Sequence, residues 1–431
     1  MENYLLDWAN LLLRWLHVIA AISWIGESIY FVMLDNGLHK PKDEASIKRG
    51  VFGEMFAVHG GGFYHSQKYL TNPPFELNED VHWSYWKSYT TWLSGFALFA
   101  LMYLANASIY LVDPAKMELS GAAASAIAVG FLVGGWIVYD GLCRLISPTM
   151  NRDGLLSIAV AVMVIGVAYA TSLIFQGRAA FLITGAVMAT SMSANVFFWI
   201  IPGQRRMFND IKAGRTPNPL DGKRGKQRSV HNTYFTLPVV FLMISNHYAF
   251  TYSHEYAWVI MALIIVSGAL IRQFFVLMHA GKKLYALPAA GTAVIVAALF
   301  VGAPQQALEQ PAVAQTAAPA VAEASAPAAG EASAPAAATA AAPAATAGVN
   351  YAQVHEVMEK RCVACHAAKP TQPGFAAAPA GLVLDQESVV RANAARINTA
   401  VKSKYMPLGN MTQMTDEERV IVDQWVSAGA K

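Results

Sequence analysis

The sequence predicts an all-α protein, an eight-span transmembrane helix bundle followed by a small helical domain. Of its 431 residues, 55% are hydrophobic and only 14% are charged. Eight apolar segments reach about 20 residues, the length that crosses about 30 Å of hydrocarbon. An Ala- and Pro-rich stretch separates these segments from a C-terminal region with helical patterns. We therefore expect the chain to be embedded in a lipid bilayer.

The eight expected spans together form a membrane domain over residues 1–302. The chain begins with Met1 to Asn10, which contains no basic cluster and no small-residue cleavage site, so we expect no removed signal peptide. The spans lie near residues 8–34, 83–112, 121–146, 155–175, 179–201, 232–253, 255–279 and 284–302.

Lys and Arg gather in alternate connections between these spans. One set follows the first span along an amphipathic stretch, and a larger set fills the expected loop between the fifth and sixth. The positive-inside rule assigns these connections to the cytoplasm and both termini to the opposite side. The net charge of +3 is too small to indicate nucleic-acid binding. The basic residues of the larger set are Arg205, Arg206, Lys212, Arg215, Lys223, Arg224, Lys226 and Arg228.

Residues 303–349 consist mainly of Ala, Pro, Glu, Ser and Thr. Such a composition cannot bury a hydrophobic core, so we expect a flexible linker. A random coil of this length spans on the order of 40 Å. The following domain, residues 350–431, could therefore reach its own membrane domain or a separate partner.

The C-terminal domain contains Cys362-Val-Ala-Cys365-His366 after an expected helix over Tyr351–Arg361. C-x-x-C-H is typical of a c-type haem site, in which two thiols form thioethers and the imidazole ligates iron. A zinc site would need a second ligand pair at matching spacing, which is absent, and a redox dithiol would not need His366. We therefore expect one covalent haem c at these residues.

The helices of this domain resemble those of a class I cytochrome c. Thr415 to Glu418 forms a capping box that starts a last helix through Trp425. In that family a Met before Pro is the usual sixth ligand. The resemblance makes Met406 the second metal ligand besides His366, with Met411 and Met414 as alternatives.

The haem motif also indicates a location, because such haems are attached outside the bacterial inner membrane. This agrees with the orientation derived from loop charge. We expect a multi-pass protein of the inner (cytoplasmic) membrane, with its N-terminus and cytochrome domain in the periplasm.

Ionisable groups within the expected spans are functional candidates, because burying them in lipid is costly. Arg14, His17, Trp24 and Glu27 share a stripe of the first span, and Arg272 shares a face of the seventh with His279. Asp140 and Arg144 are better explained as a structural ion pair, and Cys143 as a small buried hydrophobe.

Histidines occur at two depths of the expected bundle. As a set they suit a b-type haem or a substrate relay, whereas any one of them alone is more simply a satisfied core or interfacial imidazole. His17 is the best candidate to ligate an additional haem b, with His247 as the first choice of partner. His82, His231 and the pair His59 and His65 gather on the cytoplasmic side. A glycine cluster between the last two would let the backbone approach a ligand closely.

Several ordered segments over residues 5–302, together with the attached cytochrome, resemble the membrane-bound, cytochrome c-linked urate hydroxylases of bacterial purine breakdown (PuuD type). One departure is Lys87, where the resemblance leads us to expect a Glu. The segments are Arg14-Trp-Leu-His17 to Trp24-Ile-Gly26, His59 to His65, Thr91-Trp-Leu-Ser-Gly95, Asn195-Val-Phe-Phe, Ile201-Pro-Gly-Gln-Arg205, Lys226 to Asn232 and Ser245-Asn-His-Tyr248.

This resemblance implies oxidation of urate at C5 to 5-hydroxyisourate. Electrons would pass to haem c and on to an acceptor such as a cytochrome oxidase, without release of hydrogen peroxide. Urate is an anion at neutral pH, so its site needs cations and a group that takes protons. The candidate catalytic residues are His59, His65, His231 and Arg272.

An electron released at the cytoplasmic face would have to cross about 30 Å of membrane to a periplasmic haem. We therefore expect either an intramembrane redox centre with His17 as a ligand or a urate site that opens outward. A rival interpretation is an electron-transfer anchor without substrate chemistry of its own. A third is a copper or small-solute transporter, because Leu16 to Gly26 also resembles copper-resistance membrane proteins.

Overall fold

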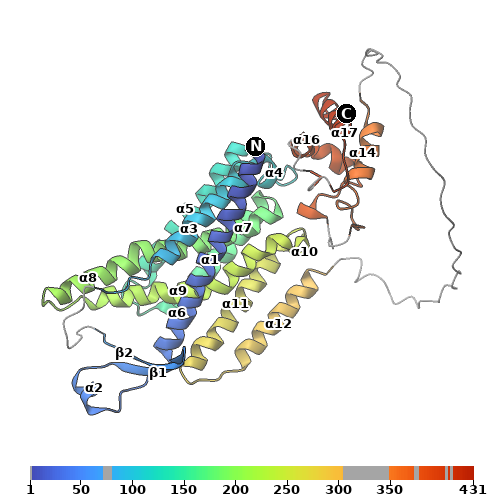
Figure 1. The fold of residues 1–431 in the computed structure, drawn as a ribbon. Helices are drawn as coiled ribbons and strands as arrows, with labels where there is room; N and C mark the ends of the chain where they lie inside the picture. Colours follow the sequence, from blue (N-terminus) through green and yellow to red (C-terminus); the bar gives the residue numbers. More distant parts are fainter. Residues whose placement is uncertain (1, 71–79, 304–348, 373–377, 403–405, 408–410) are drawn as a thin grey trace, which may run out of the picture.

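The structure is a computed structural model that describes residues 2–70, 80–303, 349–372, 378–402, 406–407 and 411–431. It is mostly helical, with a long helix bundle and a small C-terminal helical domain at one end (Figure 1). The expected linker over residues 303–349 lies almost entirely outside the described residues.

The bundle begins with a long helix, α1, that packs along α3 and its continuation. Helix α7 lies in the centre of the bundle and contacts α5, α6 and α9.

The elements of the bundle fall into three groups along the chain. The first group is α1 (Glu2–Asn36), α2 (Glu44–Lys48), α3 (Trp86–Phe99), the π-helix η1 (Ala100–Leu104) and α4 (Ala107–Tyr110). The second is α5 (Gly121–Ile146), α6 (Asp153–Ile174), α7 (Gly177–Ala194), the π-helix η2 (Asn195–Ile200) and α8 (Ile201–Lys212). The third is α9 (Pro219–Ile244), the 3-10 helix η3 (Ser245–His247), α10 (Ala249–Tyr252), α11 (Ala257–His279) and α12 (Ala286–Val301).

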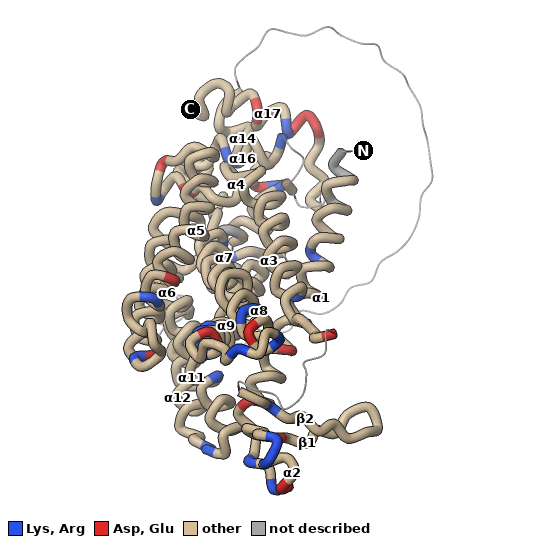
Figure 2. Tube along the Cα trace, turned by 90° about the vertical axis from the view of Figure 1, so that its left-hand side faces the viewer, with Lys and Arg blue, Asp and Glu red and all other residues tan. Residues whose placement is uncertain are grey.

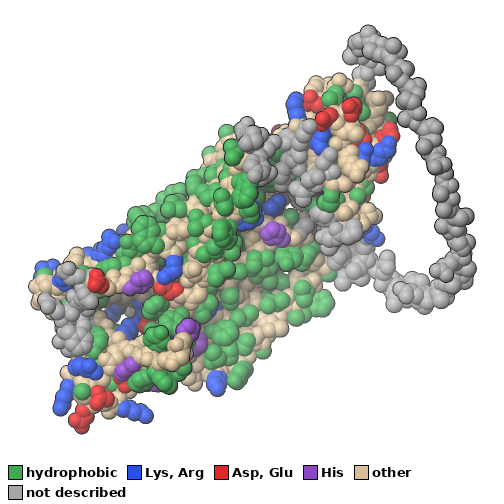
Figure 3. All heavy atoms as spheres, in the orientation of Figure 1, with side chains coloured by type: hydrophobic (Ala, Val, Ile, Leu, Met, Phe, Trp, Pro, Cys, Tyr) green, Lys and Arg blue, Asp and Glu red, His purple; other side chains and the backbone are tan. Residues whose placement is uncertain are grey.

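Within the described residues, five helices are long and apolar enough to cross a membrane, and they match five of the eight expected spans. Large apolar side chains are exposed along their outer faces, as Figure 3 shows on one side of the bundle. Exposed apolar surface of this extent suits contact with lipid. The five segments are Trp8–Asn36, Gly121–Ile146, Asp153–Ile174, Gly177–Lys212 and Ala257–His279.

The other three expected spans differ from the prediction in length or continuity. The second is divided into α3, η1 and α4, with a break at Asn106. The eighth is the shorter apolar helix Ala286–Val301. The sixth begins at Pro219, well before residue 232, because the charged segment ahead of it is also helical.

The basic segment between the fifth and sixth spans was expected to be a loop, and that prediction is wrong for most of its length. Lys, Arg and Gln are good helix formers. Asn218 caps α9, and Pro219 occupies its first position. Arg206 donates to both carboxylate oxygens of Asp221, at 2.6 and 3.1 Å, which joins α8 to α9.

The all-α prediction is also wrong in an antiparallel hairpin formed by β1 (Gly53–His59) and β2 (Gly62–Lys68). Its two-residue turn has φ of +60° at Gly60 and +78° at Gly61. Positive φ at both central positions gives the hairpin turn that matches the twist of the strands. The glycine cluster therefore forms the hairpin turn. The sequence had suggested a different role, in which these glycines let the backbone approach a ligand.

The C-terminal domain consists of α14 (Tyr351–Arg361), η4 (Pro379–Gly381), α15 (Glu387–Ala392), α16 (Ala394–Lys402) and α17 (Asp416–Ser427). The expected first helix and the capping box at Thr415 are both confirmed. Trp425 is fully buried in its core, and Arg361 joins α14 to α17 through Glu418 at 2.9 Å.

The two ends of the bundle differ in charge and in what covers them. Lys and Arg gather around the hairpin, α8 and the start of α9, which we call the basic end (Figure 2). The C-terminal domain lies against the opposite end, beside α4 and α10 (Figure 1). We call this the docking end.

Candidate functional site

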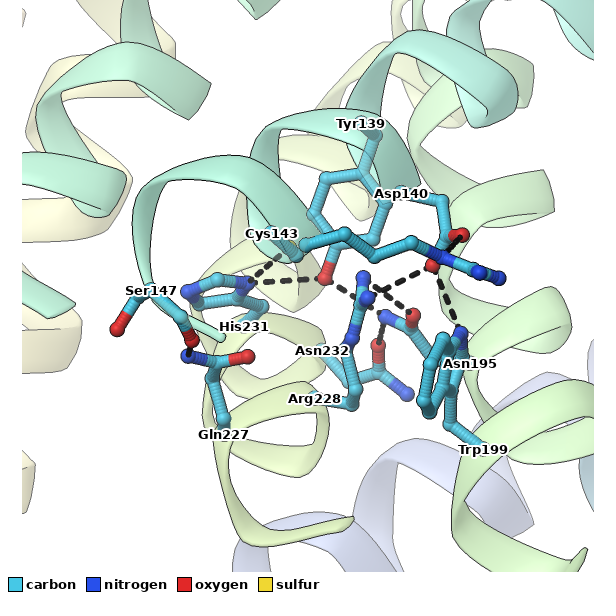
Figure 4. A network of polar contacts seen from close by, with 11 residues as sticks. Tyr139, Asp140, Cys143, Ser147, Asn195, Trp199, Gln227, Arg228, His231 and Asn232 are labelled. Carbon is cyan, nitrogen blue, oxygen red and sulfur yellow. Dashed lines mark hydrogen bonds and ion pairs between the residues drawn. The ribbon is translucent and has the colours of Figure 1, made fainter. Parts of the chain in front are cut away.

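A polar network, buried except for the exposed Arg144 and the half-buried Trp199, lies near the basic end, where α5, η2 and α9 meet (Figure 4). Asp140 is its centre. One carboxylate oxygen accepts from Arg228 Nη2 and Trp199 Nε1, each at 2.7 Å, and the other accepts from Arg144 Nε at 2.6 Å. The expected ion pair of Asp140 and Arg144 is confirmed. Two guanidinium groups share one carboxylate, so the cluster keeps an excess positive charge.

A chain of neutral hydrogen bonds continues from this cluster to His231. Asn195 Nδ2 donates to Asn232 Oδ1 and to the Tyr139 hydroxyl, both at 2.9 Å. The Tyr139 hydroxyl and His231 Nδ1 are also 2.9 Å apart. Because Asn195 already donates to the phenol oxygen, the phenol hydrogen is available for Nδ1 of the neutral imidazole. No hydrogen bond to Nε2 of His231 is found in the described part of the chain.

Helical spacing explains why these side chains converge. Arg228, His231 and Asn232 are three and four residues apart on α9, so they share one face. Asn195 and Trp199 both come from η2, a π-helical insertion between α7 and α8. Such insertions shift the register of a helix and occur frequently at functional sites. We call these residues, with Tyr139, Asp140 and Arg144, the Asp140 network.

A cavity of about 250 Å³ adjoins the Asp140 network on the side of the α5–α6 connection. Three arginines line it, and no Asp or Glu among the described residues does. Such a lining suits a small anion, because Arg presents a planar set of donors to oxygen atoms. We call it the arginine-lined cavity. Its lining residues are Cys143, Arg144, Ser147, Pro148, Met150, Trp199, Arg224, Gln227 and Arg228.

Comparison with known proteins gives the family of this chain. The family model described as urate oxidase N-terminal matches residues 3–303. The chain belongs to this urate oxidase family. The matched region contains the whole Asp140 network and the arginine-lined cavity. Comparisons with curated proteins and with solved structures gave no significant match.

Membership of this family connects the chain with the oxidation of urate. Of the four candidate catalytic residues, the structure places only His231 in the Asp140 network of the urate oxidase domain. His59 and His65 lie on the hairpin, and strand pairing puts them on opposite faces, since His59 pairs with Gly62 and His65 with Phe56.

The described contacts of the two hairpin histidines stay within the hairpin. His65 Nε2 lies 2.9 Å from Glu54 Oε2, and its ring stacks on Phe56 with centroids 4.1 Å apart. His59 is exposed. Among the described residues, no hydrogen bond connects either side chain to His231. The sequence predicted that His59, His65 and His231 gather together, whereas the hairpin keeps His59 and His65 apart from each other.

Arg272 is buried in α11 of the urate oxidase domain, with 4% of its surface exposed. Its Nε and Nη2 have no hydrogen-bond partner within the described part of the chain. The neighbouring Tyr234 hydroxyl donates to Gln273. A guanidinium without a counter-charge is costly inside a membrane, so Arg272 remains a candidate to bind an anionic group.

His17 is held between α1 and α3. Its Nδ1 donates to the backbone carbonyl of Thr91 at 2.9 Å, and Nε2 makes no hydrogen bond in the described part of the chain. Gly95 admits the ring, because a Cβ at this position would lie 2.7 Å from His17 Cε1. His247 is exposed in η3, at the docking end of α9. No contact between the two imidazoles is found among the described residues.

Lys87, the departure from the expected family pattern, pairs with Glu27 of α1 at 3.1 Å. Ser84 donates to the same carboxylate at 2.6 Å. Lys87 therefore forms an ion pair with Glu27 that connects α3 to α1. The unexpected charge at this position has a structural partner within the urate oxidase domain.

Sequence reasoning missed most of the Asp140 network. Cys143 is buried as expected, but its Sγ also lies 4.0 Å from His231 Nδ1 and lines the cavity. Arg228 was assigned to loop charge, whereas it is 2% exposed. The polar residues at i, i+3 and i+4 in Arg228, His231 and Asn232 were the available signal, because such spacing places them on one helix face.

In the C-terminal domain, the residues expected to hold haem c lie in the turn after α14. Cys362 and Cys365 are free thiols, and the backbone of Cys365 and His366 turns back to the Cys362 carbonyl. His366 Nδ1 donates to the Leu382 carbonyl at 3.0 Å, which leaves Nε2 to ligate iron. Burial lowers the pKa of His366, which favours the neutral, metal-binding form.

The three methionines proposed as the sixth ligand differ in exposure. Met414 is 3% exposed in the domain core, and Met411 is 56% exposed. Met406 lies between these extremes, and its carbonyl accepts from Arg419 Nη1 at 2.7 Å. Met406 fits the role better, because its backbone is fixed while its side chain is not part of the packed core.

The buried ion pair of Arg228 and Asp140 gives a stability prediction. Arg228→Met should lower the free energy of unfolding by about 3 kcal/mol, because it leaves a buried carboxylate with one guanidinium partner fewer. Thermal unfolding of the detergent-solubilised protein measures this. Arg224→Met, one turn earlier on α9 and without a described ion pair, is the matched control. An equal loss for both variants would contradict the structural role of the pair.

Proposed function

We propose that the chain oxidises urate to 5-hydroxyisourate at the arginine-lined cavity and passes the electrons to a haem c bound by Cys362, Cys365, His366 and Met406. The observation that carries this proposal is a cavity with three arginines and no carboxylate, inside a domain of the urate oxidase family. The reaction balances when urate and one water molecule give 5-hydroxyisourate, two protons and two electrons.

Binding of urate in this proposal depends on the arginine side chains of the cavity. Urate is a flat anion with three carbonyl-type oxygens, and guanidinium groups can donate two parallel hydrogen bonds to such atoms. Asp140 holds Arg144 and Arg228 in place from behind. The guanidinium groups of Arg144 and Arg228 are therefore oriented before a ligand binds, which lowers the entropic cost of binding.

Proton release in this proposal involves His231, which lies behind Cys143 at the cavity wall. An imidazole can accept a proton at one nitrogen and release it at the other. Tyr139 is its hydrogen-bond partner, and Asn195 fixes the orientation of the Tyr139 hydroxyl. His231 can therefore hold a proton beside the cavity wall, with its ring orientation fixed by Tyr139.

The electron path has to connect the two ends of the molecule. The cavity lies near the basic end, and the C-terminal domain lies at the docking end. When bound, haem c accepts one electron at a time. Transfer over about 30 Å of membrane is too long for one step, so we propose an additional haem b with His17 as a ligand. His17 suits this role, because its Nδ1 hydrogen bond to a carbonyl orients the ring.

The proposed orientation of the chain in the membrane follows from the difference in charge between the basic end and the docking end. The basic end would face the cytoplasm by the positive-inside rule, and the docking end the periplasm of a bacterial inner membrane. Haem attachment outside the membrane requires the same orientation. Two independent arguments thus support a periplasmic C-terminal domain.

The proposed haem b gives a spectroscopic prediction. A full-length Cys362→Ser, Cys365→Ser variant should retain a reducible haem absorbance band after the covalent haem is lost. Adding His17→Ala should remove the remaining band. His247→Ala is the comparison and should retain the band, because His247 is exposed at the docking end of α9. A double-cysteine variant without any reducible haem band would exclude an intramembrane haem.

The proposed activity is tested with the purified full-length protein, urate and an artificial one-electron acceptor such as ferricyanide. We expect loss of urate absorbance with matching reduction of the acceptor and no hydrogen peroxide. A protein that binds acceptor but leaves urate unchanged would favour the rival function, an electron-transfer anchor without substrate chemistry.

A further inference from the structure

We infer that the C-terminal domain docks on its own bundle, at the surface formed by α4, α10 and the start of α7, and that this docked position is the one in which it accepts electrons. This inference rests on the proposed function for its electron-transfer part only. The contact itself joins segments far apart in the sequence, as Figures 1 and 2 show at the docking end.

The first contact is a hydrogen bond from Arg396 of α16 to Gln176, the residue before α7. Arg396 Nη2 donates to Gln176 Oε1 at 2.7 Å. Gln176 is 3% exposed and rigidly held, because its Nε2 donates to the carbonyls of Ile109 and Val112 at 2.6 and 2.7 Å. The acceptor that Arg396 meets is therefore preorganised by the bundle.

The charge environment of this contact indicates a specific interface. Burial lowers the pKa of Arg396, and the nearby Asp113 of the bundle acts in the opposite direction. The cost of removing the Arg396 guanidinium from water is thus offset by the Asp113 carboxylate and the Gln176 amide oxygen of the bundle. Such a partly buried, complementary contact fixes the register of two surfaces more than a water-exposed pair would.

The second contact lies beside the proposed iron ligand. Gly381 ends η4, and a Cβ built on it would lie 3.6 Å from Ser253 Oγ and 3.7 Å from Ser253 Cβ, just after α10. The next residue is Leu382, whose carbonyl accepts from His366 Nδ1. The backbone next to Leu382, which orients the proposed iron ligand, therefore lies beside α10 of the bundle.

Covalent connection explains why two modest contacts suffice. The C-terminal domain is joined to α12 through residues 304–348, so docking is intramolecular. A covalent connection keeps the two domains at an effective concentration well above that of a separate partner. The occupant of the docking surface is therefore the chain's own C-terminal domain.

A disulfide trap tests the docked position in the full-length protein. Ser253→Cys with Gly381→Cys should form a disulfide, because the separation of about 3.7 Å between the two Cβ positions lies in the range for this bond. With a protease site inserted within residues 304–348, the two parts should stay joined after cleavage until a reductant is added. Each single variant and the pair Ser253→Cys with Ser427→Cys should separate. Because Gly381 has a φ of +66°, a Cys at this position strains the backbone, so the Gly381→Cys single variant should first show the haem staining of wild type. Failure of the first pair to cross-link in protein that meets this condition would overturn the docking.

The electron-transfer part is tested on the same molecules. The cross-linked protein should still show urate-driven reduction of haem c, and Arg396→Ala should slow this reduction about tenfold by removing one charged hydrogen bond. Lys402→Ala, which removes an exposed charge from the same helix, should leave the rate unchanged. A locked protein whose haem c is reduced by dithionite but not by urate, while wild type responds to both, would overturn the electron-accepting role. A wild-type protein inert to urate would contradict the proposed function alone, because the cross-link is independent of it.

Discussion

Cys365→Ser is expected to abolish covalent haem attachment and, with it, urate-driven reduction of any downstream acceptor. The reason is chemical. One of the two thiols that would hold the haem is removed, and the site after α14 depends on Cys362, Cys365 and His366 together. Haem staining on a denaturing gel should disappear, and turnover should fall to the level of a protein without haem c.

Cys143→Ser is the control for haem staining, because Cys143 is buried in the bundle and belongs to the other domain. Its staining should equal that of wild type. Acceptor-linked urate turnover that survives Cys365→Ser would show that haem c is not the obligatory acceptor, whatever its attachment chemistry.

His231→Gln should lower kcat for urate by about 10² or more, the usual contribution of a residue that transfers protons. Gln keeps a hydrogen bond with Tyr139 but cannot carry a proton across a ring. Haem staining and the thermal stability of the variant should remain close to wild type, because the side chain keeps a similar size and polarity. Steady-state turnover with an artificial acceptor measures the effect.

His59→Gln is the matched control for this prediction. His59 is exposed on the hairpin and makes no described contact with the Asp140 network. It should retain full turnover. If His59→Gln lost as much activity as His231→Gln, the hairpin would belong to the active site, as the sequence alone had suggested.

Hydropathy predicted the membrane helices well where a span is uniformly apolar. The segments expected at 121–146 and 255–279 differ from α5 and α11 by two residues at most. Hydropathy failed where a helical segment is also charged, because the basic segment before residue 232 forms the first part of α9. Hydropathy registers the cost of burying charge, whereas helix formation depends on backbone propensity and capping.

The candidate site was harder to predict, because it depends on contacts between distant helices. His231 was identified from its residue type and position, but its partners Tyr139 and Asn195 come from two other elements. His59 and His65 were grouped with it because they lie on the same side of the membrane. Strand pairing then placed these two on opposite faces of a hairpin, which single-residue patterns do not reveal.

The sequence motif of the C-terminal domain transferred more directly to structure. Cys362, Cys365 and His366 are adjacent in the chain, so a single turn after α14 suffices to bring them together. The docking contact between Arg396 and Gln176 had no such local signal, because it joins residues of two domains.

The central claim, that electrons from urate leave through haem c, is tested most directly by following both species in one anaerobic sample. Purified protein is mixed with urate and an excess of one-electron acceptor, while urate absorbance, haem c absorbance and peroxide are recorded together. The account predicts transient haem c reduction, two acceptor equivalents reduced for each urate consumed, and no peroxide. Consumption of urate while haem c stays oxidised throughout would contradict it.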